Sequence, residues 1–161
     1  MAPTFPATKA GQERPYALLS IGGYALLLPQ SEMRTLASIQ DLSLVGQRAS
    51  GVVGWLPFAG RRWPVYCLDE ALHPLPHLPP RQGLCALVKL NASYFGLVCA
   101  HVTIVPGSEV RIWPVPAAMA MPDSPIQGLS RHADSVALVS TAAALAALLG
   151  VSEATEPTRK A

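Results

Sequence analysis

Short apolar runs, each broken by glycine or proline, make up most of the chain. Runs of about four to eight apolar residues between such breakers are typical of β-strands. The pattern predicts strands at Pro15–Ile21, Tyr24–Leu28, Leu84–Leu90, Tyr94–Val105, Val110–Trp113, Ile126–Leu129 and Val136–Val139. Gly22-Gly23 separates the first two runs and favours a hairpin, because each glycine accepts a positive φ. The polar stretch Gln40–Ser50 is predicted to be a loop.

A second hairpin is predicted within Gly51–Leu72. Two runs rich in aromatic and β-branched residues flank Ala59-Gly60, and such residues favour a pleated, half-buried surface. Pro64 lies inside the second run. Because proline cannot donate to a strand ladder, Pro64 belongs at a strand start, an edge or a bulge. An edge strand in the middle of the chain is an open site for another chain, which is a first indication of a partner.

Two further stretches are ambiguous. Ser31–Ile39 fits either a short helical turn or a ragged strand. His73–Gln82 is rich in proline, which forces an extended and irregular path. We interpret this proline-rich stretch as a connection between two subdomains, although a long surface loop fits the sequence equally well.

The end of the chain predicts an amphipathic helix. Leu145, Leu148 and Leu149 share one helical face within Thr141–Leu149, and Gly150 is a typical C-cap. Residues 1–14 have no periodicity and are predicted to be a flexible lead-in, and residues 151–161 a flexible polar tail. One folded region therefore remains, Pro15–Gly150.

Composition narrows the class of protein. Half of the 161 residues are apolar and 14% are charged, which indicates a globular domain. The net charge of +2 is scattered and gives no footprint for nucleic acid. The longest apolar run, Val136–Leu149, is shorter than the roughly 20 residues that span a bilayer, so no membrane insertion is predicted. No secretory signal pattern begins the chain, and three cysteines without metal spacing fit reduced thiols in the cytoplasm.

Catalytic chemistry has few candidates in this sequence. Cys67, Cys85 and Cys99 all lie in apolar runs, where cysteine usually acts as a small, inert hydrophobic residue. We predict no catalytic residue and no cofactor.

Metal sites and nucleic-acid sites also have few candidate residues in this sequence. Cys67, His73 and His77 are conceivable metal ligands, but the intervening prolines prevent a helical face that would align the imidazoles. We predict no metal site. Arg61-Arg62 beside Trp55 and Trp63 could form a small platform for nucleic acid, but backbone binding needs more cations than two. The simpler interpretation is a buried tryptophan pair beside solvated arginines.

The predicted second hairpin also resembles a known family. Its Gly54, Gly60, Pro64, Val65 and Leu68 match, without a gap, a family pattern of Gly, a short Asn-Leu-Arg-Gly turn and Pro-Val-x-Asp-Leu. That pattern is similar to the CheW-like domains, which are adaptors of bacterial chemosensory systems. The polar members differ in this chain, where Pro57, Phe58 and Ala59 replace Asn, Leu and Arg, and Cys67 replaces Asp.

The resemblance extends over roughly Pro15 to Gly150. Glu32-Met33 is similar to a Glu–aliphatic pair of the family, and Phe95–Val98 to a strand with a central glycine. The resemblance implies a mostly β fold of two linked five-stranded SH3-like barrels with a C-terminal helix. It also implies a non-enzymatic adaptor that couples chemoreceptors to a chemotaxis-type histidine kinase, in chemotaxis or in type IV pilus motility.

In such adaptors one barrel docks on the regulatory domain of the kinase, and an apolar groove between the barrels receives the cytoplasmic tip of a chemoreceptor. The partner-binding residues implied here match family positions or lie in the hairpin turn, and they are Glu32, Met33, Gly54, Phe58, Ala59, Gly60 and Pro64. Alanine at the arginine position predicts altered or weakened kinase coupling. Two alternatives remain open: a barrel that binds a small apolar ligand between its subdomains, and an enzyme of unknown type.

Overall fold

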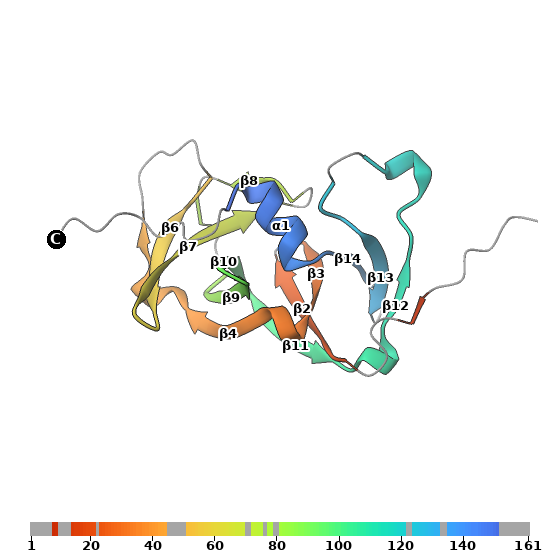
Figure 1. The fold of residues 1–161 in the computed structure, drawn as a ribbon, viewed down its shortest axis with the longest axis horizontal. Coiled ribbons are helices and arrows are strands. Elements are labelled where there is room, and N and C mark those ends of the chain that lie inside the picture. The colour runs from red at the N-terminus through yellow and green to blue at the C-terminus, as the bar shows by residue number, and fades with distance from the viewer. Residues whose placement is uncertain are drawn as a thin grey trace, which may run out of the picture.

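The structure is a computed structural model that describes residues 8–9, 14–21, 23–44, 51–69, 72–75, 77–78, 81–121, 124–132 and 135–151. Within these ranges the chain forms two β-sheets and one α-helix, α1 (Ala142–Leu149) (Figure 1). Four short 3-10 helices accompany them, at Gln30–Glu32, Ile39–Asp41, Gly107–Glu109 and Ala117–Met119. No helix in the described ranges is both long and apolar enough to cross a membrane.

The first sheet joins strands from both ends of the described chain. In spatial order its strands are β1 (Thr8–Lys9), β12 (Arg111–Trp113), β13 (Gly128–His132), β14 (Ser135–Val139), β3 (Tyr24–Pro29), β2 (Tyr16–Ile21) and β11 (His101–Val105). β2 and β3 pair across Ile21 and Tyr24, as expected for the predicted hairpin, of which Gly22 lies outside the described residues. β1 lies within the predicted lead-in of residues 1–14 and pairs with β12.

The second sheet is built from one continuous part of the chain. In spatial order its strands are β4 (Met33–Ser38), β9 (Leu84–Leu90), β10 (Ser93–Cys99), β7 (Arg61–Leu68), β6 (Gly54–Phe58) and β5 (Ser43–Leu44), and β8 (Pro74–Leu75) pairs with β7. Each sheet contains five strands of five residues or more. The predicted mostly β fold in two parts with a C-terminal helix is therefore confirmed.

Three sequence-based expectations need correction. Ser43–Leu44, inside the predicted loop Gln40–Ser50, forms β5 because its backbone pairs with β6. The proline-rich stretch His73–Gln82 does not connect two subdomains, since it leads from β7 to β9 in the same sheet. The predicted strand Tyr94–Val105 is two strands, β10 and β11, in different sheets. Ser31–Ile39, left open by its pattern, is mainly the strand β4.

The chain crosses between the sheets at two places. The 3-10 helix Gln30–Glu32 leads from β3 in the first sheet to β4 in the second. Ala100 leads back from β10 to β11, and its amide donates to the Ser20 carbonyl at 2.8 Å. Each crossing therefore ends in an edge strand of the sheet that it enters.

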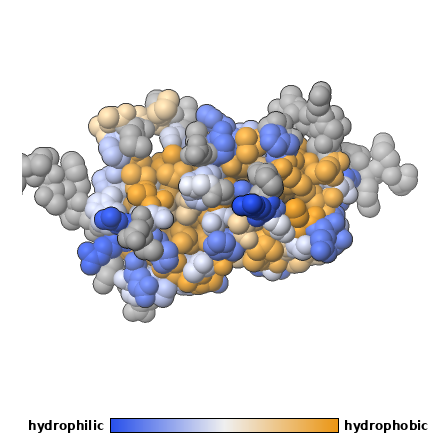
Figure 2. Space-filling model, turned by 180° about the vertical axis from the view of Figure 1, so that it is seen from behind, coloured by the Kyte–Doolittle hydropathy of each residue, from blue (hydrophilic) through white to orange (hydrophobic). Residues whose placement is uncertain are grey.

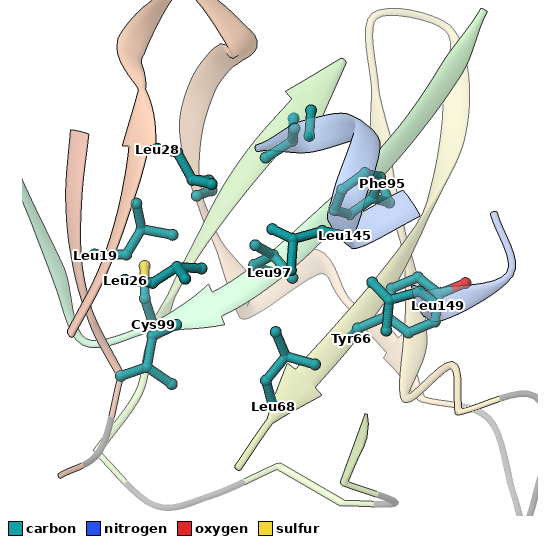
Figure 3. Packing of buried hydrophobic residues seen from close by; sticks show 14 of the residues in the cluster. Leu19, Leu26, Leu28, Tyr66, Leu68, Phe95, Leu97, Cys99, Leu145 and Leu149 are labelled. Carbon is teal, nitrogen blue, oxygen red and sulfur yellow. The ribbon is translucent and has the colours of Figure 1, made fainter. Parts of the chain in front are cut away.

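A central cluster of buried side chains lies between the two sheets and α1. It draws residues from β2, β3, β7, β9, β10 and α1, so it belongs to neither sheet alone (Figure 3). Each sheet also has a smaller core of its own, which contains Val105 and Val139 in the first sheet and Trp63 and Tyr94 in the second. The central cluster fills the space between the sheets.

Helix α1 closes the central cluster with Leu145 and Leu149 (Figure 3). Thr141 Oγ1 accepts from the Ala144 amide at 3.1 Å, which caps the first turn. Gly150 ends the helix in the left-handed region, with φ 73°, where glycine is favoured. The predicted helix and its C-cap are confirmed.

Candidate functional site

The first candidate surface is the crossing from β3 to β4, which carries Glu32 and Met33. Glu32 Oε1 accepts from the Ala142 amide at 2.7 Å, at the first residue of α1. The first amides of a helix have no partner within the helix and attract negative charge, so this carboxylate stabilises the helix start. The structure therefore places the Glu32 side chain in an internal contact that holds the crossing to α1.

Met33 is the first of several apolar side chains along β4 and β11, the two edge strands that follow the crossings. Directly opposed residues on paired strands project from the same face of a sheet. Leu36 is opposite Ala86, and Ile104 is opposite Ala17, and both alanines belong to the central cluster. Met33 and Val102 pack against the same cluster, whereas Leu36 and Ile104 are 39% and 44% exposed.

We define the apolar margin as Met33 and Leu36 on β4 with Val102 and Ile104 on β11. Apolar side chains that continue a buried cluster into solvent are typical of interaction surfaces. Hydrophobic residues also gather over broad areas of the face opposite to that in Figure 1, with hydrophilic residues between them (Figure 2).

The second candidate surface is the β6–β7 hairpin, which holds the other five predicted residues. Phe58 and Arg61 flank a two-residue turn in which Ala59 and Gly60 have φ of 52° and 77°. Two successive positive φ values are typical of a type I′ hairpin turn. The predicted hairpin is confirmed, and alanine at its first turn position costs on the order of 1 kcal/mol relative to glycine.

The packing and pairing of neighbouring strands account for Gly54 and Pro64. A Cβ on Gly54 would lie 2.7 Å from the Ser43 carbonyl oxygen, so glycine allows β5 to approach β6. Pro64 is buried, and the ladder between β7 and β10 begins only at the next residue, Val65. β7 lies between β6 and β10, so the edge strand expected from Pro64 is not observed. The missing amide is tolerated because the pairing of β7 with β10 begins only after Pro64.

The base of the hairpin turn is braced by aromatic rings. Phe58 packs edge-on against Trp63 with ring centroids 6.0 Å apart, and Trp63 packs in the same way against Tyr94 at 5.0 Å. Trp63 Nε1 donates to the Phe58 carbonyl across the turn at 3.1 Å. These contacts hold Phe58, which is half-buried, in a fixed position at the surface.

The seven predicted residues thus form two groups instead of one site. β9, β10 and β7 separate β4 from β6 within the second sheet, so Glu32 and Met33 lie apart from the turn of the hairpin. Leu36, Val102 and Ile104 were not among the predicted residues, because only strand pairing shows which face of each edge strand they occupy.

The cysteines are buried in the second sheet. Burial raises the pKa of Cys67 and of Cys99 to about 12, and it also raises the pKa of Cys85. A thiolate, the form that attacks substrates and binds metals, is therefore disfavoured at all three positions. His73 is exposed instead and lies 3.9 Å from Asp69, and no three His, Cys, Asp or Glu side chains gather as metal ligands in the described part of the chain.

A surface pocket of about 450 Å³ is relevant to the alternative function, the binding of a small apolar ligand. It lies beside the crossing and is lined by Arg14, Pro15, Tyr16, Pro29, Gln30 and Ser31. This lining comes from the first sheet and the crossing, whereas the predicted ligand site between the subdomains coincides with the filled central cluster.

Comparison with known proteins identifies the fold. No family model and no curated protein matches the sequence. Among solved structures, the chain is similar to the crystal structure of the scaffolding protein TtCheW from Thermoanaerobacter tengcongensis, with a TM-score of 0.63 and 15% sequence identity. The match covers 80% of this chain and 89% of that chain. The chain has a CheW-like fold.

Proposed function

We propose that this protein is a non-enzymatic adaptor of a bacterial chemosensory pathway, which couples chemoreceptors to a chemotaxis-type histidine kinase in the cytoplasm. The observation that carries the proposal is its structural likeness to a scaffolding protein over most of both chains. The sequence pattern of the β6–β7 hairpin supports it independently, since Gly54, Gly60 and Pro64 occupy family positions. The raised pKa values of the thiols support a role without covalent catalysis.

The two candidate surfaces suit two partners. We assign the β6–β7 hairpin, with Phe58, Ala59 and Gly60 at its turn, to the regulatory domain of the kinase. The apolar margin, with Met33, is assigned to the cytoplasmic tip of the receptor. A patch of apolar side chains with a polar rim is sufficient for such docking, and a typical interface buries about 800 Å² on each partner.

Glu32 acts on the receptor surface through the backbone in this proposal. Its carboxylate holds the crossing against α1, and Met33 follows it directly. Gly54 and Pro64 similarly set the shape of the hairpin. Among the residues predicted from sequence, Met33 and Phe58 are therefore expected to make the strongest side-chain contacts.

The proposal is tested by size-exclusion chromatography of this protein with the kinase encoded nearest to it, with and without a receptor cytoplasmic fragment. We expect one ternary peak. Phe58→Ala is expected to remove the kinase from the peak and to leave the receptor fragment bound. Leu36→Asp is expected to have the opposite effect, because a charge enters the apolar margin.

Exposed Val136→Asp provides a matched control, since Val136 lies on β14 inside the first sheet and belongs to neither surface. Separate peaks for the wild-type protein and for every kinase and receptor fragment tested would refute the adaptor function. Equal losses of both partners with either variant would refute the assignment of two surfaces.

A further inference from the structure

The β6–β7 hairpin carries two arginines immediately after its turn, Arg61 and Arg62. Arg61 Cζ lies 5.2 Å from the ring centroid of Tyr94, and Arg62 Cζ lies 5.3 Å from that of Trp55. Both distances are within the range of a cation–π contact. Each guanidinium is therefore held against an aromatic face, although both arginines are exposed.

The two arginines serve opposite faces of the hairpin, because successive residues of a strand alternate in direction. Arg61 is opposite Phe58 and lies over Tyr94, whose side chain belongs to the second-sheet core. Arg62 is opposite Pro57 and lies over the half-buried Trp55 on the other face. A partner that contacts both faces of the hairpin turn would meet one guanidinium on each face.

Neither guanidinium is neutralised within the described part of the chain. Among the described residues, the contact between a basic and an acidic side chain is that of His73 with Asp69, and neither arginine takes part in it. A ring contact engages the flat face of a guanidinium and leaves the N–H groups at its edge, which form a planar fork that suits a carboxylate. The hairpin thus presents two oriented donor forks, and none of the described residues forms an ion pair with either of them.

We propose that Arg61 and Arg62 bind carboxylates on the surface of a partner protein that docks on the β6–β7 hairpin. This inference rests on the proposed function, in which the partner at this hairpin is the regulatory domain of the kinase. Arginine and tryptophan side chains beside a half-buried Phe58 are the residue types that carry most of the binding energy in protein interfaces. Charge complementarity then requires acidic side chains on the partner.

A protein partner is favoured over nucleic acid by the placement of the charges. Arg61 and Arg62 point to opposite faces, so they cannot follow one phosphate backbone together. Binding to a nucleic-acid backbone usually engages a row of phosphates and several cations. Two separated arginines, each supported by one ring, match discrete carboxylates instead.

The test measures binding of the full chain to the purified regulatory domain of the neighbouring kinase by calorimetry, at low and high salt. Arg61→Ala and Arg62→Ala are each expected to weaken binding about tenfold, and the double variant more strongly. Arg62→Lys is expected to lie between Arg62→Ala and wild type, because lysine keeps the charge but loses the planar fork. Arg131→Ala, which removes an exposed arginine from the first sheet, is the matched control and should bind as wild type.

The outcomes separate this inference from the proposed function. Wild-type binding that is unchanged by Arg61→Ala and Arg62→Ala would overturn the inference and leave the adaptor function intact. Absence of wild-type binding to the kinase would overturn both. A single-stranded oligonucleotide that binds at physiological salt, and loses binding in the same arginine variants, would identify nucleic acid as the occupant and would also overturn the inference.

Discussion

The two sheets show the same order of antiparallel and parallel strand pairs, but they differ in which parts of the chain supply their strands. Across β11, β2, β3, β14, β13 and β12, only the pair β3–β14 is parallel. Across β5, β6, β7, β10, β9 and β4, only the pair β7–β10 is parallel. The second sheet, however, is continuous from β4 to β10, whereas the first is completed only after the second has been traversed.

This difference shows where long-range order is needed. The first sheet depends on the pairing of β3 with β14, and the contact between Glu32 and Ala142 spans 110 residues. Contacts between distant parts of a chain carry a large entropic cost of loop closure and slow folding. All strand pairs of the second sheet lie within one segment of the chain, whereas the first sheet pairs strands from both sides of that segment.

The largest expected effect comes from breaking the central cluster with Phe95→Ala. Phe95 is fully buried and packs edge-on against Tyr66 with centroids 6.3 Å apart. The substitution is expected to lower the free energy of unfolding by about 3–5 kcal/mol, because it removes a buried ring and leaves a cavity. Urea denaturation gives the loss, and hydrogen exchange should show reduced protection in both β2–β3 and β6–β7.

Leu56→Ala is the control for Phe95→Ala, since Leu56 is buried in the second-sheet core only. It is expected to reduce protection in β6–β7 more than in β2–β3. Unchanged exchange of β2–β3 in the Phe95→Ala variant would contradict a shared central cluster.

A smaller effect is expected from adding one methyl group to each sheet. In Gly96→Ala the new Cβ would meet Cys85 Sγ at 2.5 Å, and in Gly128→Ala it would meet Ile112 Cγ2 at 2.6 Å. Overpacking costs about 1–3 kcal/mol, depending on how far the neighbours can move. Gly96→Ala is expected to be the more costly, because Cys85 is fully buried on the interior strand β9, whereas Ile112 is half-buried on the short strand β12.

A second substitution, Cys85→Ala, tests whether the loss of stability in Gly96→Ala comes from the contact with Cys85. Cys85→Ala removes the atom nearest to the new methyl group, so it should recover part of the stability lost in Gly96→Ala and none of that lost in Gly128→Ala. Equal losses in the two single variants, measured from urea midpoints, would mean that both sheets are equally rigid at these positions.

A further effect is absent near neutral pH and concerns the cysteines of the second sheet. Burial raises the pKa of Cys67 and Cys99 from 9.0 to about 12, so the folded protein keeps protons that the unfolded chain releases. The resulting stability is present below about pH 9 and is lost progressively as the pH rises toward 12. Denaturation at a series of pH values should show this decline, and Cys67→Ala should make it shallower.

Reaction with a thiol reagent at pH 8 provides the accompanying control, since all three buried cysteines belong to the second sheet. We expect no labelling of the folded protein on the time scale at which the denatured chain reacts fully. Rapid labelling of the folded protein would show that the second sheet opens on its own, and it would also argue against the inert role assigned to these residues.

Several strands, the hairpin turn and the helix of this protein follow from local sequence patterns. Alternating and apolar runs gave the strands β2, β3, β9 and β14, and Ala59-Gly60 gave the hairpin turn, because turn geometry depends mainly on the two residues that adopt it. Leucine spacing and Gly150 likewise specified α1. The resemblance of the hairpin to the CheW-like pattern pointed to the fold that the solved structure of a scaffolding protein supports.

The distribution of these elements between the two sheets depends on contacts between distant parts of the chain. The run Tyr94–Val105 changes from continuous apolar residues to an alternating pattern after Ala100, but no glycine or proline interrupts it there, and strand pairing is needed to show that the chain changes sheet at this point. The contact of Glu32 with the start of α1 and the placement of each arginine on an aromatic ring join residues that are distant or on different strands. Periodicity describes the faces of one element, whereas a surface is created by the pairing of several, and that pairing depends on long-range packing.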